Sequence, residues 1–384
     1  MKTRILLSVA ALTLAAGLVS CVGGSFFPFG GSPSFPTTPK FLIAVDAVAG
    51  ADVNLFPITA TTGALGAAVS GSPFDMGLTD GMTLAVHPNG RFVYAADGND
   101  GAIHAWSVNE TTGKPTEIAP KVVTESNTFY EPSGNGDSPT HVITITPNGK
   151  FLYAANNDAT VGAYKINSNG SLTHIADLNI AACDTGAITA NNNFVWVTDT
   201  CGSLGPWNVF TLKIGSDGSL TKVSSVALTG VRSWLWSVQA NPAANFLYVG
   251  DEGGSAQIYS FSIATDGSLT QLGPQIVENS SSDVRDIAHS PDGKFFYTTD
   301  NITKVHTFSV NTTSGAITEV ASSPISGGAG QIVVDITGKF VYLGDQELTG
   351  QVLGFTRDAT TGTLTLIGNT STAQGFAMAI GIVR

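Results

Sequence analysis

A few residues of this sequence have side chains that could exchange a proton with a ligand or hold its oxygen atoms. A carboxylate or an imidazole can take a proton from water as a general base, and a guanidinium can stabilise a developing oxyanion. His141 and Arg285 are expected to open inner strands at one mouth of the fold, and Glu252 and Arg232 lie near the same mouth. Asp184, Trp236 and Asp251 are expected beside them at the same mouth of the fold.

Motifs for other kinds of catalysis are absent from the sequence. It contains no G-x-S-x-G, no H-E-x-x-H, no phosphate-binding loop and no C-x-x-C-H haem attachment. We therefore expect no cofactor.

An acidic residue or an asparagine closes each copy of a recurring aromatic strand: Asp46, Asp97, Asn156, Asp199, Asp251, Asp300 and Asp345. Oxygen ligands at one phase of a repeat could hold a hard cation such as calcium. The alternative is that each side chain accepts hydrogen bonds from backbone N–H groups just downstream and starts a turn. Recurrence in every copy favours the structural interpretation, so no metal site is assigned.

The chain repeats one unit seven times. Its aromatic strand begins at Phe41, Phe92, Phe151, Phe194, Phe246, Phe295 and Phe340. A hairpin glycine follows each one, at Gly63, Gly113, Gly170, Gly218, Gly267, Gly315 and Gly362. Each unit holds four antiparallel strands joined by tight turns, and a sheet that is apolar on both faces must stack on its neighbours. We expect an all-β fold, a seven-bladed β-propeller with four antiparallel strands per blade.

Ring closure can also be predicted. The first copy has no strand before Phe41, whereas the last residues, 375–384, look like a first strand with nothing after it. This C-terminal strand should complete blade one.

Variable loops on a rigid scaffold usually carry function. At the start of the first strand, one position holds a different residue type in each unit. Counting back from the turn that follows the strand gives Met82, His141, Asp184, Trp236, Arg285 and Gly330 for this position.

Two cysteines lie symmetrically about the turn expected near residue 192 of the fourth unit, Cys183 and Cys201. Directly opposed residues of an antiparallel hairpin have Cα atoms about 5 Å apart, which is compatible with a disulfide. Export would permit the bond to form. We expect the disulfide, and two free buried thiols are the alternative.

The P-N-G-K-F-L-Y strand at Pro147 and the G-S-L-T hairpin at Gly170 resemble the seven-bladed lactonase family, of the 6-phosphogluconolactonase and carboxymuconate-cyclase type. The resemblance covers about residues 40–384 and implies a site built from a His, an Arg-His pair, a Glu and a second Arg. His141 and Glu252 match the first and third of these groups.

The two arginine-containing groups of the family are not found where the resemblance places them. The Arg-His pair would fall at Trp236 and Ser237, and the last Arg at Asn301. Their loss argues against an anionic sugar phosphate as substrate. Arg232 and Arg285 lie near the same mouth and could substitute.

The N-terminus is typical of an exported lipoprotein. Lys2 and Arg4 precede the apolar stretch 5–18, which is shorter than the ~20 residues of a membrane span, and Cys21 follows Leu-Val-Ser as in a lipobox. The expected segments are a signal peptide 1–20, a Gly/Pro/Ser-rich tether 21–39 and the propeller 40–384. Lipid attachment at Cys21 is expected, and Val22 after it favours the outer membrane or cell surface. An ordinary secretory signal is the alternative.

The acidic balance limits the partners. A formal net charge of −12 disfavours binding to nucleic acid. We expect a monomer that contacts the membrane through its N-terminal lipid only. Two functions stay open. His141 and Glu252 favour hydrolysis of a small-molecule lactone, whereas the missing arginines favour a non-catalytic propeller that binds a protein, a glycan or another cell-envelope ligand.

Overall fold

The structure is a computed structural model in which every described element is a β-strand. It describes residues 38, 40–46, 52–78, 81–98, 100–123, 142–180, 184–199, 207–228, 231, 234–251, 257–276, 284–300, 303–325, 329–345, 350–371 and 377–384. Within these ranges there is no helix long and apolar enough to cross a membrane.

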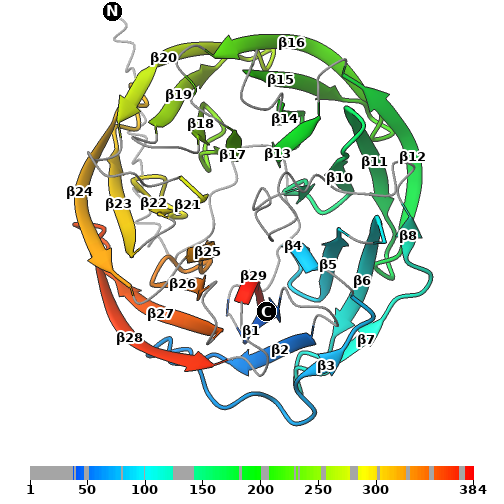
Figure 1. Cartoon of the computed structure of the whole chain (residues 1–384), viewed down its shortest axis with the longest axis vertical. Coiled ribbons are helices and arrows are strands. Elements are labelled where there is room, and N and C mark those ends of the chain that lie inside the picture. Colours follow the sequence, from blue (N-terminus) through cyan, green and yellow to red (C-terminus); the bar gives the residue numbers. More distant parts are fainter. Residues whose placement is uncertain are drawn as a thin grey trace, which may run out of the picture.

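The strands form seven sheets, each with four strands from the centre outward, here named a to d (Figure 1). Blades 1 to 3 are β29 (Ala377–Val383), β1 (Phe41–Asp46), β2 (Asp52–Pro57) and β3 (Phe74–Asp75); β4 (Gly81–Val86), β5 (Phe92–Asp97), β6 (Ala102–Val108) and β7 (Pro115–Glu117), with β8 (Val122–Val123) also on β6; and β9 (Ile143–Ile145), β10 (Phe151–Ala155), β11 (Thr160–Ile166) and β12 (Leu172–Asn179).

Blades 4 to 7 continue the pattern with longer outer strands. They are β13 (Thr185–Ala190), β14 (Phe194–Asp199), β15 (Trp207–Ile214) and β16 (Leu220–Leu228); β17 (Leu235–Ala240), β18 (Phe246–Asp251), β19 (Gln257–Ile263) and β20 (Leu269–Ile276); β21 (Asp286–His289), β22 (Phe295–Thr299), β23 (Lys304–Val310) and β24 (Ile317–Pro324); and β25 (Ala329–Val334), β26 (Phe340–Asp345), β27 (Gln351–Arg357) and β28 (Leu364–Ser371).

The predicted seven-bladed propeller is confirmed, and so is its closure. The C-terminal strand β29 pairs with β1 along its length, from Phe41 opposite Val383 to Asp46 opposite Ala377. It therefore supplies the inner strand that blade 1 lacks in the N-terminal part of the chain. The ring is held shut by hydrogen bonds and packing between the two ends of the domain.

Neighbouring blades are joined by the repeated aromatic residues of strand b. The ring of Phe151 packs on Gly218 of the next blade, where φ is +92° and an added Cβ would lie 2.4 Å from the ring. Only glycine fits both that backbone and that contact. Two residues after Phe151, the Tyr153 hydroxyl donates a hydrogen bond to the Gly218 carbonyl at 3.0 Å. In five other blades the residue equivalent to Tyr153 donates a hydrogen bond to the carbonyl of the equivalent glycine in the next blade. These residues are Tyr94, Trp196, Tyr248, Tyr297 and Tyr342.

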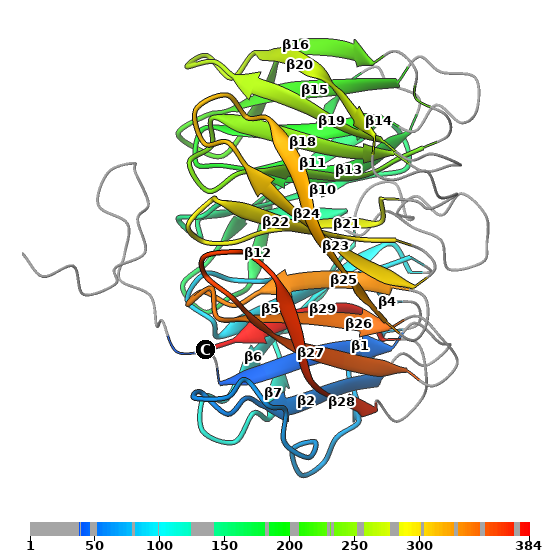
Figure 2. The same cartoon turned by 90° about the vertical axis from the view of Figure 1, so that its left-hand side faces the viewer.

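The tight a–b and c–d turns share one face of the ring, which we call the tight-turn face. In each blade the residue before the strand-b phenylalanine accepts, through its carbonyl, the N–H of a residue at the end of strand c, as Lys150 does from Ile166 at 2.9 Å. Figure 2 shows this face on the left, where the C-terminus lies. The starts of strands a and the ends of strands b lie on the opposite face, which we call the mouth.

Candidate functional site

β-Bulges mark the inner strands at the mouth. In blade 5, Leu235 pairs with Asp251 and Ser237 with Gly250, so Trp236 is the extra residue. Blade 2 has the same shift between Gly81 and Thr83. A bulge re-aims the side chain of the extra residue and is frequent next to functional sites. The extra residue of the bulge is thus the same position whose residue type varies from blade to blade.

Blade 4 does not follow the predicted phase. Ala190 pairs with Val195, whereas in blade 3 Ile145 pairs with Leu152, so the a–b turn of blade 4 is two residues shorter. The residue equivalent to Trp236 is therefore Gly186 and not Asp184, and the assignment of Asp184 to this position was wrong. Asp184 lies two residues further from the turn.

The Asp184 carboxyl is half-buried at the start of blade 4. Burial first, and then the nearby Asp158 carboxylate, raise the pKa of Asp184. Asp184 therefore belongs to the contact between blades 3 and 4.

Three of the predicted residues meet between blades 5 and 6. The guanidinium carbon of Arg285 lies 4.2 Å from the centre of the Trp236 ring, and both side chains are almost wholly buried. The end of strand b joins them, because the Val284 N–H donates to the Asp251 carbonyl at 3.0 Å. The indole N–H of Trp236 is buried and has no hydrogen-bond partner among the described residues. The Asp251 carboxylate itself faces the start of strand c, where it accepts the N–H of Gln257. The cation on the aromatic face is therefore the part of this group that could hold a ligand's oxygen atoms.

The Arg285 backbone is fixed by its neighbours in the sheet. Its N–H donates to the Thr299 carbonyl of β22 at 3.0 Å. The next residue, Asp286, uses one carboxylate oxygen for the N–H of Ile287 at 2.7 Å and the other for the N–H of Ile332 in blade 7 at 2.9 Å. The strand that carries Arg285 is therefore hydrogen-bonded on both sides, to β22 and to blade 7.

The described carboxylates that close the b strands are turn residues. Asp199 accepts the backbone N–H and the side-chain amide of Asn208, both at 2.7 Å. Asp300 accepts the N–H groups of Thr303 and Lys304 at 2.8 and 2.7 Å. These contacts hold the start of strand c, as the structural interpretation requires. The side chains of Asp46 and Asp345 lie outside the described residues.

One group in the described chain has the spacing of a metal site. Ligand atoms of Asp97, Asp100 and His104 lie within 4.8 Å of one another. The ammonium of Lys121 already contacts Asp100, and His104 Nε2 lies 3.1 Å from the same carboxylate oxygen. An ion pair therefore accounts for the charges of this group, and we assign no metal to it.

Several of the predicted site residues lie outside the described residues. They are His141, Glu252 and Arg232, the lipid-attachment residue Cys21, and the cysteines Cys183 and Cys201. The described pair closest to the cysteines is Thr185 opposite Asp199, two residues inside each of them. The disulfide and the roles of His141, Glu252 and Arg232 stay predictions.

Solved structures with the same fold include lactonases. The chain superposes on the periplasmic gluconolactonase of Pseudomonas aeruginosa with a TM-score of 0.74 at 16% identity, covering 90% of this chain and 99% of that one. Putative 6-phosphogluconolactonases of Bacteroides fragilis and Bacteroides uniformis give TM-scores of 0.70 and 0.71 at 18% identity, covering 92% and 90% of this chain and 100% of each of those. At these identities the likeness shows the fold alone. Among curated proteins, no relative was found.

The family assignment comes from the sequence. The family model described as Lactonase, 7-bladed beta-propeller, matches residues 34–197 and 278–379. The unmatched stretch between them holds Trp236 and Asp251, where the expected arginine pair is missing. The match nevertheless spans well over half of the chain, and the protein belongs to the seven-bladed β-propeller lactonase family.

Proposed function

We propose that the protein hydrolyses a small lactone at the mouth between blades 5 and 6. The observation that carries this proposal is the Arg285 guanidinium stacked on Trp236 at 4.2 Å. The resemblance to the family places an Arg-His pair at Trp236 and Ser237. Here the neighbouring blade brings a guanidinium over that same position. The cation that the sequence lacks at this strand is thus supplied from the next one.

The proposed reaction needs a base and an oxyanion partner. Water attacks the lactone carbonyl carbon while His141 or Glu252 takes its proton. Arg285 stabilises the negative charge that develops on the carbonyl oxygen. The ring C–O bond then breaks, the proton passes to the leaving alkoxide, and the product is a hydroxy acid. Arg232 is proposed as a second binding group for the substrate's oxygen atoms.

The substrate is proposed to be a neutral lactone. The positions that would bind a phosphate or carboxylate in the family hold Trp236, Ser237 and Asn301. The periplasmic gluconolactonase of Pseudomonas aeruginosa, which shares the fold, is named for a sugar lactone without phosphate. A sugar lactone therefore suits the mouth better than a sugar phosphate.

Hydrolysis of D-glucono-1,5-lactone followed in a pH-stat tests the proposal. Wild type should turn it over, and Glu252→Gln should lower kcat/KM by about a hundredfold, in the range of general-base catalysis. Arg285→Gln should lower kcat by a similar factor. Glu117→Gln, at an exposed carboxylate of blade 2, is the matched control and should act like wild type. Equal rates for Glu252→Gln and wild type would rule out Glu252 as the base.

A binding function without catalysis is the second candidate. The burial of Arg285, 2% exposed, favours it, because a guanidinium already covered by protein is less available to a substrate. The gap in the family match over residues 198–277 points the same way. Calorimetric binding of cell-envelope glycans, in the absence of turnover of any neutral lactone, would support this alternative over the enzyme.

We also propose that the protein is exported and anchored by a lipid on Cys21. The charged start, the apolar stretch 5–18 and the lipobox-like residues support this, and so does the location of the periplasmic gluconolactonase. Mass spectrometry of the mature protein should find an acylated Cys21 at its N-terminus. Cys21→Ser should move the protein out of the membrane fraction. The same spectra should show Cys183 and Cys201 joined, and two free thiols would contradict that pairing.

A further inference from the structure

A ring of cations lies on the tight-turn face. The residue before the strand-b phenylalanine is basic in five of the seven blades, namely Lys40, Arg91, Lys150, Lys294 and Lys339. Blades 4 and 5 carry Asn193 and Asn245 there. The carbonyl of this residue accepts an N–H from the end of strand c in every blade, at 2.8 or 2.9 Å. The cations are therefore equivalent points on one circle.

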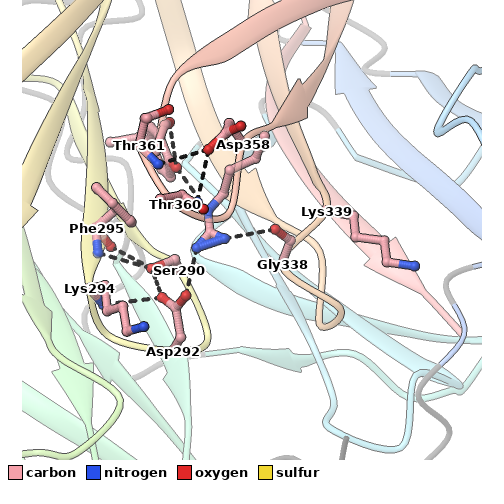
Figure 3. A network of polar contacts seen from close by, with 12 residues as sticks. Ser290, Asp292, Lys294, Phe295, Gly338, Lys339, Asp358, Thr360 and Thr361 are labelled. Atoms are coloured by element: carbon pink, nitrogen blue, oxygen red, sulfur yellow. Dashed lines mark hydrogen bonds and ion pairs between the residues drawn. The ribbon is translucent and has the colours of Figure 1, made fainter.

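Three of these cations are free of carboxylates. Lys150, Lys294 and Lys339 are exposed and form no ion pair with another described residue. Figure 3 shows Lys294 and Lys339 beside the polar network of blades 6 and 7, which Lys294 joins through its backbone N–H to Asp292 at 3.1 Å. The other two cations, Lys40 and Arg91, share one carboxylate, that of Glu110, at 3.4 and 2.9 Å.

The acids of the same face do not cancel this ring. Asp292 is paired with Arg357 at 2.7 Å, and Asp335 is buried under its own turn, where it accepts the N–H groups of Lys339 and Phe340. Asp217, Asp266 and Asp358 lie in c–d turns, at the outer strands, where each accepts hydrogen bonds from residues two or three positions on. The inner circle thus keeps a positive excess on a chain whose formal net charge is −12.

The described acids at the ends of the b strands, at the mouth, are not exposed in the same way. Each b strand with a described end finishes there in a buried or partly buried acid or asparagine, as at Asp97, Asp199 and Asp251. A basic ring on an otherwise acidic protein is a footprint for an anionic surface.

The start of the domain lies on the same basic face. The Lys40 N–H donates to the Val383 carbonyl at 2.9 Å, which places the first residue of blade 1 at the tight-turn end of β29. Figure 2 shows the C-terminus at this edge. The segment that leads back to Cys21 therefore joins the propeller at the cationic ring.

We propose that the tight-turn face docks on an anionic lipid surface and holds the mouth away from the membrane. Basic side chains near an anionic bilayer each add to its binding, and the effect fades within a Debye length. The orientation relative to the anchor rests on the proposed lipid at Cys21, but the affinity of the face does not. The substrate mouth would then open toward the aqueous side.

Sedimentation of residues 40–384 with vesicles tests the docking without the anchor. This part contains every strand of the closed ring. It should bind vesicles of equal phosphatidylglycerol and phosphatidylcholine in dilute salt, and bind vesicles of phosphatidylcholine alone at least tenfold more weakly. Raising the salt to about 0.5 M should abolish the difference.

Two triple variants separate the ring from net charge. Lys150→Gln, Lys294→Gln and Lys339→Gln together should weaken binding to the anionic vesicles by about a hundredfold. Ala176→Glu, Ser225→Glu and Ser322→Glu change the net charge equally at exposed positions on the outer wall, and should retain most of the binding. Equal losses in both triples, or equal binding to both vesicle types, would overturn the proposal. Either result would leave the lactonase and lipid-anchor proposals untouched.

Discussion

The contact between blades 6 and 7 and the contact between blades 1 and 2 follow the same repeat but pack differently. Between blades 6 and 7, the Arg357 guanidinium donates to the Asp292 carboxylate at 2.7 Å, to the Gly338 carbonyl at 3.0 Å and to the Tyr297 hydroxyl at 3.1 Å. Figure 3 shows Asp292 and Gly338, one from each blade, in this network. Its side chain is 2% exposed. The Arg357 side chain thus connects a turn of each blade with the Tyr297 hydroxyl, which itself joins the two blades.

Between blades 1 and 2 these contacts are missing. The position of Tyr297 is taken by Ile43, which has no hydroxyl, and the outer strand β3 has only two residues. A cavity of about 340 Å³ remains there, lined by Phe74, Met76, His104 and Trp106 among others. The ion pair near this contact, Arg91 with Glu110 at 2.9 Å, is largely exposed.

The difference shows that the repeat fixes the backbone but not the strength of each contact. The hydrogen bond from strand b to the next hairpin glycine and an outer strand of full length are both present between blades 6 and 7. Blade 1 has neither. The ring is expected to open first at blade 1.

The largest expected effect comes from removing the strand that closes blade 1. Deleting residues 375–384 removes β29, which is the inner hydrogen-bonding partner of β1. The deletion also removes the buried side chains of Ala379, Ile380 and Val383. We expect loss of the cooperative thermal transition, followed by circular dichroism. Deleting residues 22–37 instead should leave the melting temperature unchanged. A truncated ring that melts like wild type would contradict the closure.

The second prediction compares the two arginines. Arg357→Ala leaves the Asp292 carboxylate and two buried oxygens without their donor, and should lower the free energy of unfolding by about 2–3 kcal/mol. Arg91→Ala removes an exposed pair and should cost less than about 1 kcal/mol. Urea denaturation measures both. If the two costs are equal, the buried network does not strengthen its interface.

Blades 5 and 6 offer a test by pH. Both ring nitrogens of His289 are buried without a partner among the described residues, between Tyr248 and Phe296, and burial lowers the pKa of His289 to about 3. The unfolded chain takes up a proton near pH 6.5, so stability from this group is present above that pH and is lost as the pH falls.

Replacing this imidazole should remove part of the acid sensitivity. Between pH 7 and pH 5, wild type should lose about 2 kcal/mol more than His289→Leu. Urea denaturation at several pH values compares them. Parallel pH profiles for wild type and His289→Leu would show that His289 is hydrated.

The smallest expected effect concerns the hydroxyl ties. Tyr153→Phe removes one donor to the Gly218 carbonyl and should lower the free energy of unfolding by about 1 kcal/mol. Tyr248→Phe should act alike, because its tie to Gly315 has the same length of 3.0 Å. A cost near zero for both would mean that water replaces the hydroxyl and that phenylalanine packing alone joins the blades.

The candidate site was only partly predictable. Counting from the turn predicts the bulge position in blades 2 and 5, because their a–b turns have the same length. Counting from the turn failed at Asp184, since the turn of blade 4 is two residues shorter. Trp236 and Arg285 were both singled out from the sequence, but their stacking depends on two blades about fifty residues apart and has no local signal.

By itself, the sequence determined the number of blades, the strands within them and the closure by residues 375–384. These follow from local periodicity: an aromatic strand, a glycine that must have positive φ, and a repeat of about fifty residues. Only the tertiary structure decided which blades are tightly joined, that the strand-end acids bind their own turns, and that Arg285 covers Trp236. Those outcomes depend on side chains from different blades meeting across an interface, where reach and burial, rather than sequence spacing, set the contact.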